Sequence, residues 1–139
     1  MDNLPTRPFI DLDHARVAVE AARAKATDLG ISVVATVVDP GGLVVTLDRM
    51  AGAPLLSMDL AVDKAWTAVS LGSPTQAVWD GVSTRPDLVA GLAGRGRISL
   101  LGGGVPIVWN GTVVGAIGVS GGTAAEDVLC AESGVEALG

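Results

Sequence analysis

The sequence predicts an α+β domain in which a central antiparallel sheet of about five strands is flanked by helices. Two hairpin signals support this class. They are Asp-Pro-Gly-Gly at positions 39–42 and Asn-Gly at 110–111, each between short runs of β-branched apolar residues. Helical patterns precede the first hairpin, separate the two hairpins and follow the second. Hairpins pair antiparallel strands, and helices interspersed with them pack on the faces of the resulting sheet.

Capping and turn residues place the individual elements. Asp11 or Asp13 can cap a first helix that stops at Gly30, and Ser57 can cap a second helix over 57–71. The other expected elements are strands at 31–38 and 43–48, a helix from 74 to about 82, an irregular stretch at 83–97, a candidate fifth strand at 98–101, the hairpin around 110–111, and a helix at 124–138.

The composition predicts a single domain and a partner for part of its surface. Residues 1–10 are expected to form a flexible N-terminal arm and residues 11–139 the domain. Hydrophobic residues make up 49% of the chain and charged residues 17%, against about 25% charged in typical proteins. We therefore expect a homo-oligomer, a dimer or larger. A net charge of −6 without a Lys/Arg run argues against nucleic acid and membrane partners.

Several sequence signals are absent, and their absence predicts where the protein is located and whether it holds a metal. One cysteine, no apolar signal segment at the N-terminus and no apolar run of ~18 residues predict a cytoplasmic protein. No His or Cys spacing typical of a metal site is present, so we expect no metal centre.

The most glycine-rich stretch, residues 100–122, is a candidate wall of a binding site. Its two glycine clusters flank the second hairpin, which brings them side by side. Backbone without side chains allows close approach of another group, and the backbone N–H groups of Gly103 and Gly104 could then bind an anion. The alternative is that these glycines only supply turns and bends.

Several charged or polar side chains could carry chemistry. Asp63 and Lys64 lie in the middle of a very apolar helix, where a charge is costly unless it is paired or faces a cavity. They either form a surface strip or an inter-subunit salt bridge, or one of them lines a pocket with Thr67. Arg49 is either a solvated loop residue or a ligand for a carboxylate. His14, the single histidine, is either a solvated or capping residue or a ligand.

Three motifs resemble, in order and spacing, those of the GlcG/HbpS haem-binding-like family, which includes the C-terminal domain of PduO-type proteins. They are VVDPGGLVVTLDRMAGAP, DKAWTA and GGGVPIVWNGTVVGAIGVSGG, and the similarity extends from about residue 11 to the end. The resemblance implies a profilin-like fold and assembly into dimers or larger rings. The matching positions are Asp39, Gly41, Gly42, Arg49, Met50, Ala53, Pro54, Asp63, Lys64, Thr67, Gly103, Gly104, Val105, Pro106, Ile107, Gly115, Gly118, Val119 and Ser120.

The leading hypothesis is therefore an oligomeric small-molecule-binding protein, with haem or a related tetrapyrrole as the named candidate ligand. We expect its pocket between the second helix, the loop 49–54 and the glycine hairpin. With one His and no Tyr in the chain, the axial ligand would be His14, a methionine or a weak oxygen ligand. The candidate ligand-binding residues are Arg49, Met50, Thr67, Gly103, Gly104, Pro106 and Ser120.

Two other functions remain open from the sequence. A cofactor-independent lyase or isomerase could hold a small carboxylate with Arg49 and the Gly103 and Gly104 amides, while Asp63 or Lys64 moves the proton. A non-catalytic accessory subunit is the third hypothesis. Whether the protein is an enzyme is thus left undecided at this point.

Overall fold

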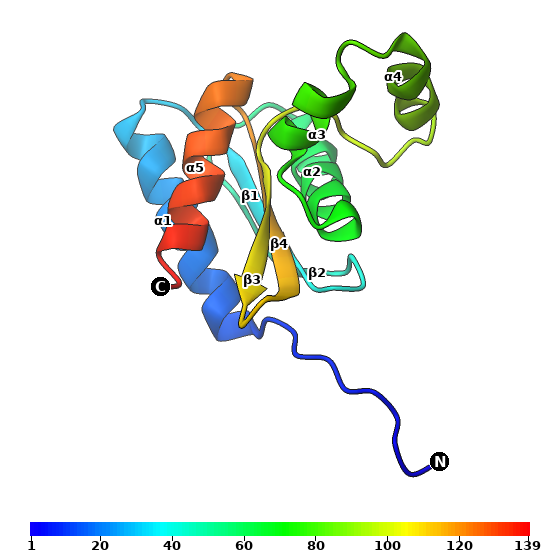
Figure 1. Ribbon diagram of the computed structural model, residues 1–139. Helices are drawn as coiled ribbons and strands as arrows, with labels where there is room; N and C mark the ends of the chain where they lie inside the picture. The colour runs from blue at the N-terminus through cyan, green and yellow to red at the C-terminus, as the bar shows by residue number, and fades with distance from the viewer.

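The computed structural model describes residues 1–139 and shows a four-stranded antiparallel sheet between two layers of helices (Figure 1). The strand order is β2-β1-β4-β3. Helices α1 and α5 cover one face, and α2 covers the other. The α+β class is therefore confirmed. The elements are α1 (Leu12–Asp28), β1 (Val34–Val38), β2 (Val44–Arg49), α2 (Ser57–Leu71), α3 (Thr75–Val82), α4 (Pro86–Ala93), β3 (Gly104–Trp109), β4 (Thr112–Ser120) and α5 (Ala124–Glu136).

Both hairpins form as their turn residues predict. Asn110 and Gly111 have φ angles of 48° and 76°, which are the two positive values that a type I′ turn needs. In the first hairpin the Asp39 carboxylate accepts from the backbone N–H groups of Gly41 and Leu43, at 2.8 and 3.1 Å. The hydrogen bonds of Asp39 help to set the register of β2 on β1, and the turn at Asn110 and Gly111 helps to set that of β4 on β3.

The main core lies between the sheet and the α1–α5 layer and is built from small and branched side chains. Strand β1 is buried along its whole length because helices cover both of its faces. The chain has few aromatic residues, and alanines of α1 instead fill the core by packing closely against α5 and the sheet. The core contains Ile10, Ala15, Ala18, Val19, Ala22, Ala26, Val33, Ala35, Val37, Ile107, Val114, Ile117, Val119, Cys130 and Ala131.

On the opposite face, α2 lies directly on the backbone of β3 and β4. A Cβ atom at Gly118 would run into the carbonyl oxygen of Ala61 and would lie 2.7 Å from the backbone nitrogen of Ala65. A Cβ atom at Gly104 would lie 2.8 Å from the backbone carbonyl carbon of Lys64. The glycines of the hairpin therefore serve the approach of a helix.

Three details differ from the sequence-based expectations. Residues 98–101 do not form a fifth strand, so the sheet has four strands. The segment is a loop because the Thr67 hydroxyl, on α2, accepts from the backbone N–H of Ser99 at 2.9 Å. The stretch expected to be irregular contains α4, which has no buried residue and stands away from the sheet (Figure 1). Ser57 is the first residue of α2 and not its cap, which is Leu56.

None of the five helices combines the length and the apolar character that crossing a membrane requires.

Replacing Gly118 with Ala should destabilise the fold by about 2 kcal/mol or more, because the new methyl group overlaps the backbone of α2. Gly91→Ala is the matched control. Gly91 lies in α4, and a methyl group added there would come within 4 Å of no atom beyond its chain neighbours and its own helix backbone, so helix propensity should raise stability slightly. Urea unfolding of both variants measures the difference. Equal stabilities would contradict the direct seating of α2 on the sheet.

Candidate functional site

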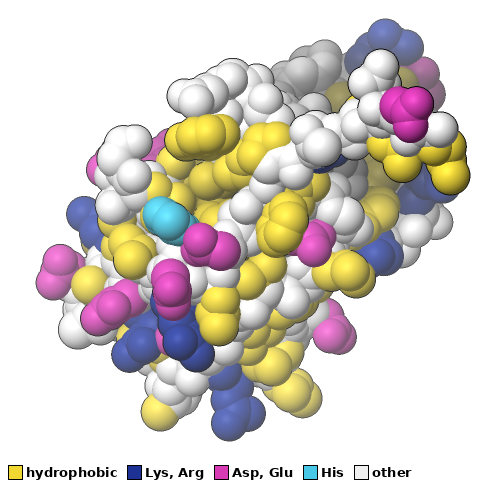
Figure 2. All heavy atoms as spheres, turned by 90° about the horizontal axis from the view of Figure 1, so that it is seen from below, with side chains coloured by type: hydrophobic (Ala, Val, Ile, Leu, Met, Phe, Trp, Pro, Cys, Tyr) yellow, Lys and Arg dark blue, Asp and Glu magenta, His cyan; other side chains and the backbone are white.

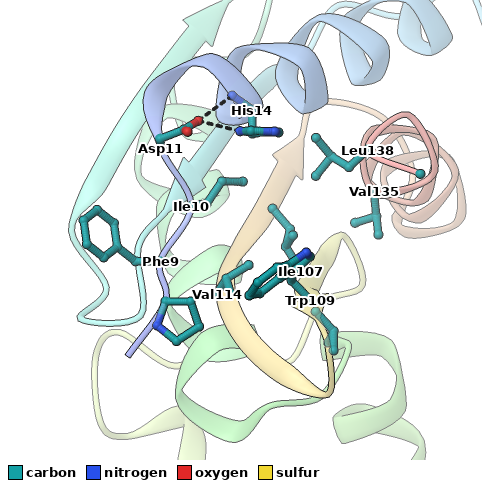
Figure 3. Close-up of a pocket in the computed structure, with 12 residues that line it drawn as sticks. Phe9, Ile10, Asp11, His14, Ile107, Trp109, Val114, Val135 and Leu138 are labelled. Carbon is teal, nitrogen blue, oxygen red and sulfur yellow. Dashed lines mark hydrogen bonds and ion pairs between the residues drawn. The ribbon is translucent and has the colours of Figure 1, made fainter. Parts of the chain in front are cut away.

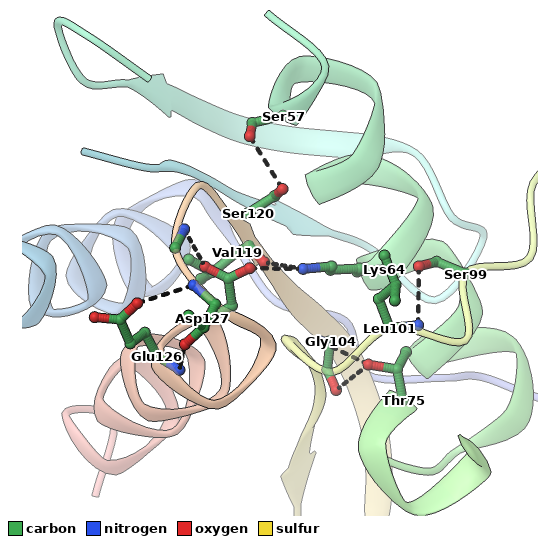
Figure 4. Close-up of polar contacts among 12 residues, drawn as sticks. Ser57, Lys64, Thr75, Ser99, Leu101, Gly104, Val119, Ser120, Glu126 and Asp127 are labelled. Atoms are coloured by element: carbon green, nitrogen blue, oxygen red, sulfur yellow. Dashed lines mark hydrogen bonds and ion pairs between the residues drawn. The ribbon is translucent and has the colours of Figure 1, made fainter. Parts of the chain in front are cut away.

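The side chain of Lys64 reaches from α2, on one face of the sheet, to α5 on the other. Its ammonium donates to the Asp127 carboxylate and to the backbone carbonyl of Val119, both at 2.9 Å (Figure 4). Lys64 is 1% exposed and Asp127 3%. The path exists because Gly103 has no side chain: a Cβ atom there would lie 3.0 Å from the Lys64 Nζ. The charged residue singled out from the sequence is therefore part of an internal ion pair.

Burial is the largest cause of the pKa shifts of Lys64 and Asp127. Loss of water lowers the pKa of Lys64 below 10.5, although the Asp127 carboxylate opposes the shift. Loss of water likewise raises the pKa of Asp127 above 3.8, against the charge of Lys64 and the backbone N–H of Gly122, which donates to Asp127 at 2.9 Å. The pair joins the glycine hairpin, α2 and the first turn of α5. Neither Lys64 nor Asp127 lines the groove of about 490 Å³ beside His14.

Asp63 lies next to Lys64 on α2 but points to a different environment. It is half-buried, and the loss of water raises the pKa of its carboxyl above 3.8, while the Arg97 guanidinium opposes the shift. That guanidinium also lies over the indole ring of Trp66, 4.5 Å from its centre. Asp63 thus belongs to a partly exposed acidic and aromatic surface of α2.

Three of the polar groups expected to bind a ligand, the Gly104 N–H and the hydroxyls of Thr67 and Ser120, are engaged in hydrogen bonds within the chain. The Thr75 hydroxyl accepts from the backbone N–H of Gly104 at 2.9 Å, and the Thr67 hydroxyl holds the loop before β3. The Ser120 hydroxyl donates to that of Ser57 at 3.1 Å (Figure 4). These contacts fasten α2 and α3 to the end of the sheet.

The remaining residues of the candidate set do not converge on one point. Arg49 is exposed at the end of the edge strand β2, and Pro106 is buried within β3. Met50 is half-buried, packs against the main core and accepts the backbone N–H of Val33 on its sulfur at 3.4 Å. The structure therefore brings Lys64, Gly103 and Gly104 together but leaves Arg49 and Met50 apart from them.

A groove of about 490 Å³ lies at a different place from the pocket that the sequence predicted. It is formed by the segment before α1, the tip of the β3–β4 hairpin and the end of the chain after α5. In the space-filling view the single histidine lies at the rim of a hollow in which hydrophobic side chains gather (Figure 2). The groove is lined by Pro8, Phe9, Ile10, Asp11, His14, Ile107, Val108, Trp109, Val114, Val135, Leu138 and Gly139.

Among the residues of this groove, His14 has the side chain best suited to act as a ligand. Its Nδ1 lies 2.7 Å from Oδ1 of Asp11, and the same oxygen accepts from the backbone N–H of His14 at 2.9 Å (Figure 3). The ring extends away from Asp11 toward the side of the groove where Leu138 lies (Figure 3). A histidine held through one ring nitrogen keeps the other nitrogen available for a further contact, here beside an apolar wall.

Sequence reasoning missed most of the groove and half of the ion pair. Phe9, Trp109, Val135 and Leu138 are far apart in the chain, and no local pattern joins them. The sequence identifies Asp127 only as an acidic residue in the first turn of a helix. Its position directly after the second glycine cluster, opposite a helix carrying an unpaired lysine, is the signal that could have found it.

Comparison with known proteins identifies relatives over nearly the whole chain. The family model for haem-degrading, HbpS-like proteins matches residues 10–136. A 15.0 kDa Citrobacter freundii protein of the dhaT-dhaS intergenic region is 39% identical over 128 residues, covering 91% of this chain and 90% of that one. The corrinoid adenosyltransferase PduO of the same organism is 34% identical over 120 residues, but this chain spans only 36% of its length.

Two solved structures share the fold and an appreciable part of the sequence. The Klebsiella pneumoniae protein ORFY superposes with a TM-score of 0.92 at 34% identity, covering 99% of this chain and 96% of that one. A complex of PduOC with haem superposes with a TM-score of 0.86 at 30% identity, covering 93% and 94% of the two chains.

Replacing Lys64 with Met should cost about 3–5 kcal/mol of stability, because the Asp127 carboxylate is left buried without its partner. In the double variant K64M/D127N no charge remains, and the Asn oxygen can still accept from Gly122, so part of the loss should be recovered. Urea unfolding of both single variants and the double variant gives the coupling energy.

Arg23→Met is the control for the Lys64 variant, since Arg23 pairs with Asp48 at 2.8 Å on the surface and should contribute less than about 1 kcal/mol. A Lys64→Met variant as stable as this control would show that the buried pair does not join the two faces of the sheet.

Replacing Asp63 with Asn should stabilise the protein at pH 7, by less than about 1 kcal/mol because the carboxyl is partly solvated. A pKa raised in the folded state means that ionisation opposes folding. This free-energy penalty on the folded state is absent at low pH, where the Asp63 carboxyl is protonated in both the folded and the unfolded protein. It develops as the pH rises above 3.8. The gain over the wild type, measured by urea unfolding, should therefore shrink toward pH 4. Glu132→Gln, at an exposed site on α5, is the control. If D63N were less stable than the wild type at pH 7, the claim that the ionised Asp63 carboxylate opposes folding would be wrong.

Proposed function

Because the chain belongs to the HbpS-like family, we propose that it binds haem or a related tetrapyrrole in the groove beside His14. The observation that carries the proposal is the His14 imidazole, held by Asp11 at 2.7 Å on the rim of a groove with apolar walls. The structure of PduOC with haem shows that a protein with 30% sequence identity and the same fold binds this group.

The residues of the groove fit such a ligand in chemistry, and the groove has the size of a small-molecule site. A volume of about 490 Å³ lies within the roughly 300–1,000 Å³ typical of small-molecule sites. Ile107, Val114, Val135 and Leu138 offer apolar surface to a flat ring system, and Trp109 offers an aromatic one. The bound haem would supply an iron centre whose behaviour depends on its axial ligand and on the polarity around it.

His14 is favoured over a methionine as the axial ligand. The sulfur of Met50 already accepts a backbone hydrogen bond and packs against the core, and Met50 is not among the residues lining the groove. The imidazole is anchored through one nitrogen only, so the other remains available. We therefore assign the ligand role to His14.

The alternative of a cofactor-independent lyase or isomerase has one supporting observation, the raised pKa of Asp63, since such a shift is common in catalytic carboxylates. Lys64, its proposed partner in proton transfer, is enclosed and paired with Asp127. This arrangement supports a structural role for Lys64, and the haem hypothesis is the stronger one.

Assembly into a homo-oligomer also belongs to the proposal. Large apolar side chains remain exposed on and beside α2, α3 and α4, and α4 has no buried residue. A surface of this kind is typical of an interface between subunits. The side chains are Leu55, Leu56, Leu71, Trp79 and Leu88.

Titration of the protein with haemin tests the proposed site. We expect a stoichiometric Soret shift for the wild type and an affinity at least about tenfold lower for His14→Ala, because the axial bond is lost. Glu20→Ala, on an exposed position of α1 outside the groove, should bind as the wild type does. Met50→Leu separates the alternatives: loss of binding in this variant with full binding in H14A would overturn the assignment.

A further inference from the structure

We propose that Asp11 is a positioning residue for the axial ligand: its carboxylate fixes the direction and the tautomer of the His14 ring so that Nε2 is free to bind iron. The inference rests on the proposed haem site. It assigns to Asp11 a role beyond capping α1, which is the only role that its position in the sequence suggests.

One carboxylate oxygen makes both contacts with His14. Oδ1 of Asp11 lies 2.9 Å from the backbone nitrogen and 2.7 Å from Nδ1 of the ring. An ionised carboxylate can only accept hydrogen bonds, so in the neutral imidazole the proton must be on Nδ1. The lone pair is then on Nε2, the nitrogen that points away from Asp11. The contact thereby selects the tautomer that leaves Nε2 free to bind a metal.

The position of Asp11 is fixed from both sides along the chain. On one side α1 is anchored by side chains such as Ala15, Ala18 and Val19, which are buried against the sheet and α5. On the other side the backbone N–H of Ile10 donates to the carbonyl of Val114 at 2.8 Å, which ties the preceding segment to β4. A carboxylate held this way can restrain a ring that is otherwise solvated.

Stability alone does not account for the ring contact. The side chains of Asp11 and His14 are 61% and 69% exposed, and pairs this exposed contribute little to folding. The cap requires only the backbone N–H of His14, which Ser or Asn at the same position would accept equally well. The additional bond to Nδ1 restrains the single histidine of the groove, and a carboxylate on Nδ1–H also makes the opposite nitrogen a stronger donor.

Two substitutions separate the ring contact from the cap. Asp11→Ser retains a capping hydroxyl, but its side chain is shorter and cannot also restrain the ring. Asp11→Asn retains the cap and an oxygen that accepts from Nδ1, but it removes the negative charge. Both variants and the wild type are titrated with haemin, and the reduction potential and the electron paramagnetic resonance spectrum of each ferric complex are recorded. Thermal unfolding without haemin monitors the cap.

We expect equal unfolding temperatures for the three proteins. The haemin affinity should fall about 10–100-fold in D11S and by less in D11N. The D11N complex should have a more positive reduction potential, because a neutral amide leaves His14 a weaker donor to ferric iron. If D11S binds haemin within twofold of the wild type with an unchanged spectrum, Asp11 is a cap only and the inference is wrong. That result would leave the haem site itself intact, whereas full binding by H14A would refute the site.

Discussion

The ion pair between Lys64 and Asp127 is the interaction on which the arrangement of the layers depends. Among the ion pairs of the chain, it alone connects the helix on one face of the sheet with a helix on the other. It needs room beside residue 103, where Gly103 has no side chain, and a carbonyl acceptor, which Val119 provides. Glycine clusters that resemble a ligand-binding loop in sequence are therefore explained by the passage of a lysine side chain and by the seating of α2.

This organisation separates the part of the molecule that maintains the fold from the part that can bind a ligand. The glycine end of the sheet is closed by hydrogen bonds from Thr67, Thr75 and Ser120. The groove opens near the other end of the hairpin, where Trp109 and the segment before α1 leave apolar surface accessible. A rigid sheet can thus support a site built largely from the ends of the chain.

Much of the fold could be predicted from the sequence because its strongest signals are local. Asn110 and Gly111 determine their turn, Asp39 determines the other, and Asp11 caps α1. The ion pair and the groove depend on contacts between distant segments. Asp127 is 63 residues from Lys64, and residues 8–14, 107–114 and 135–139 meet only after folding. The sequence indicates that Lys64 needs a partner and that His14 could be a ligand, but it cannot say what lies beside either.

Histidine labelled with ¹⁵N tests the central claim directly, because His14 is the single histidine of the chain. In protein labelled in this way and loaded with haemin, pulsed electron–nuclear double resonance detects ¹⁵N bound to the ferric ion. A strong ¹⁵N coupling can then arise only from His14 coordinating the iron, and that is the result predicted here. Bound haemin without a ¹⁵N coupling would contradict the account, since the iron would then be held elsewhere or by another ligand.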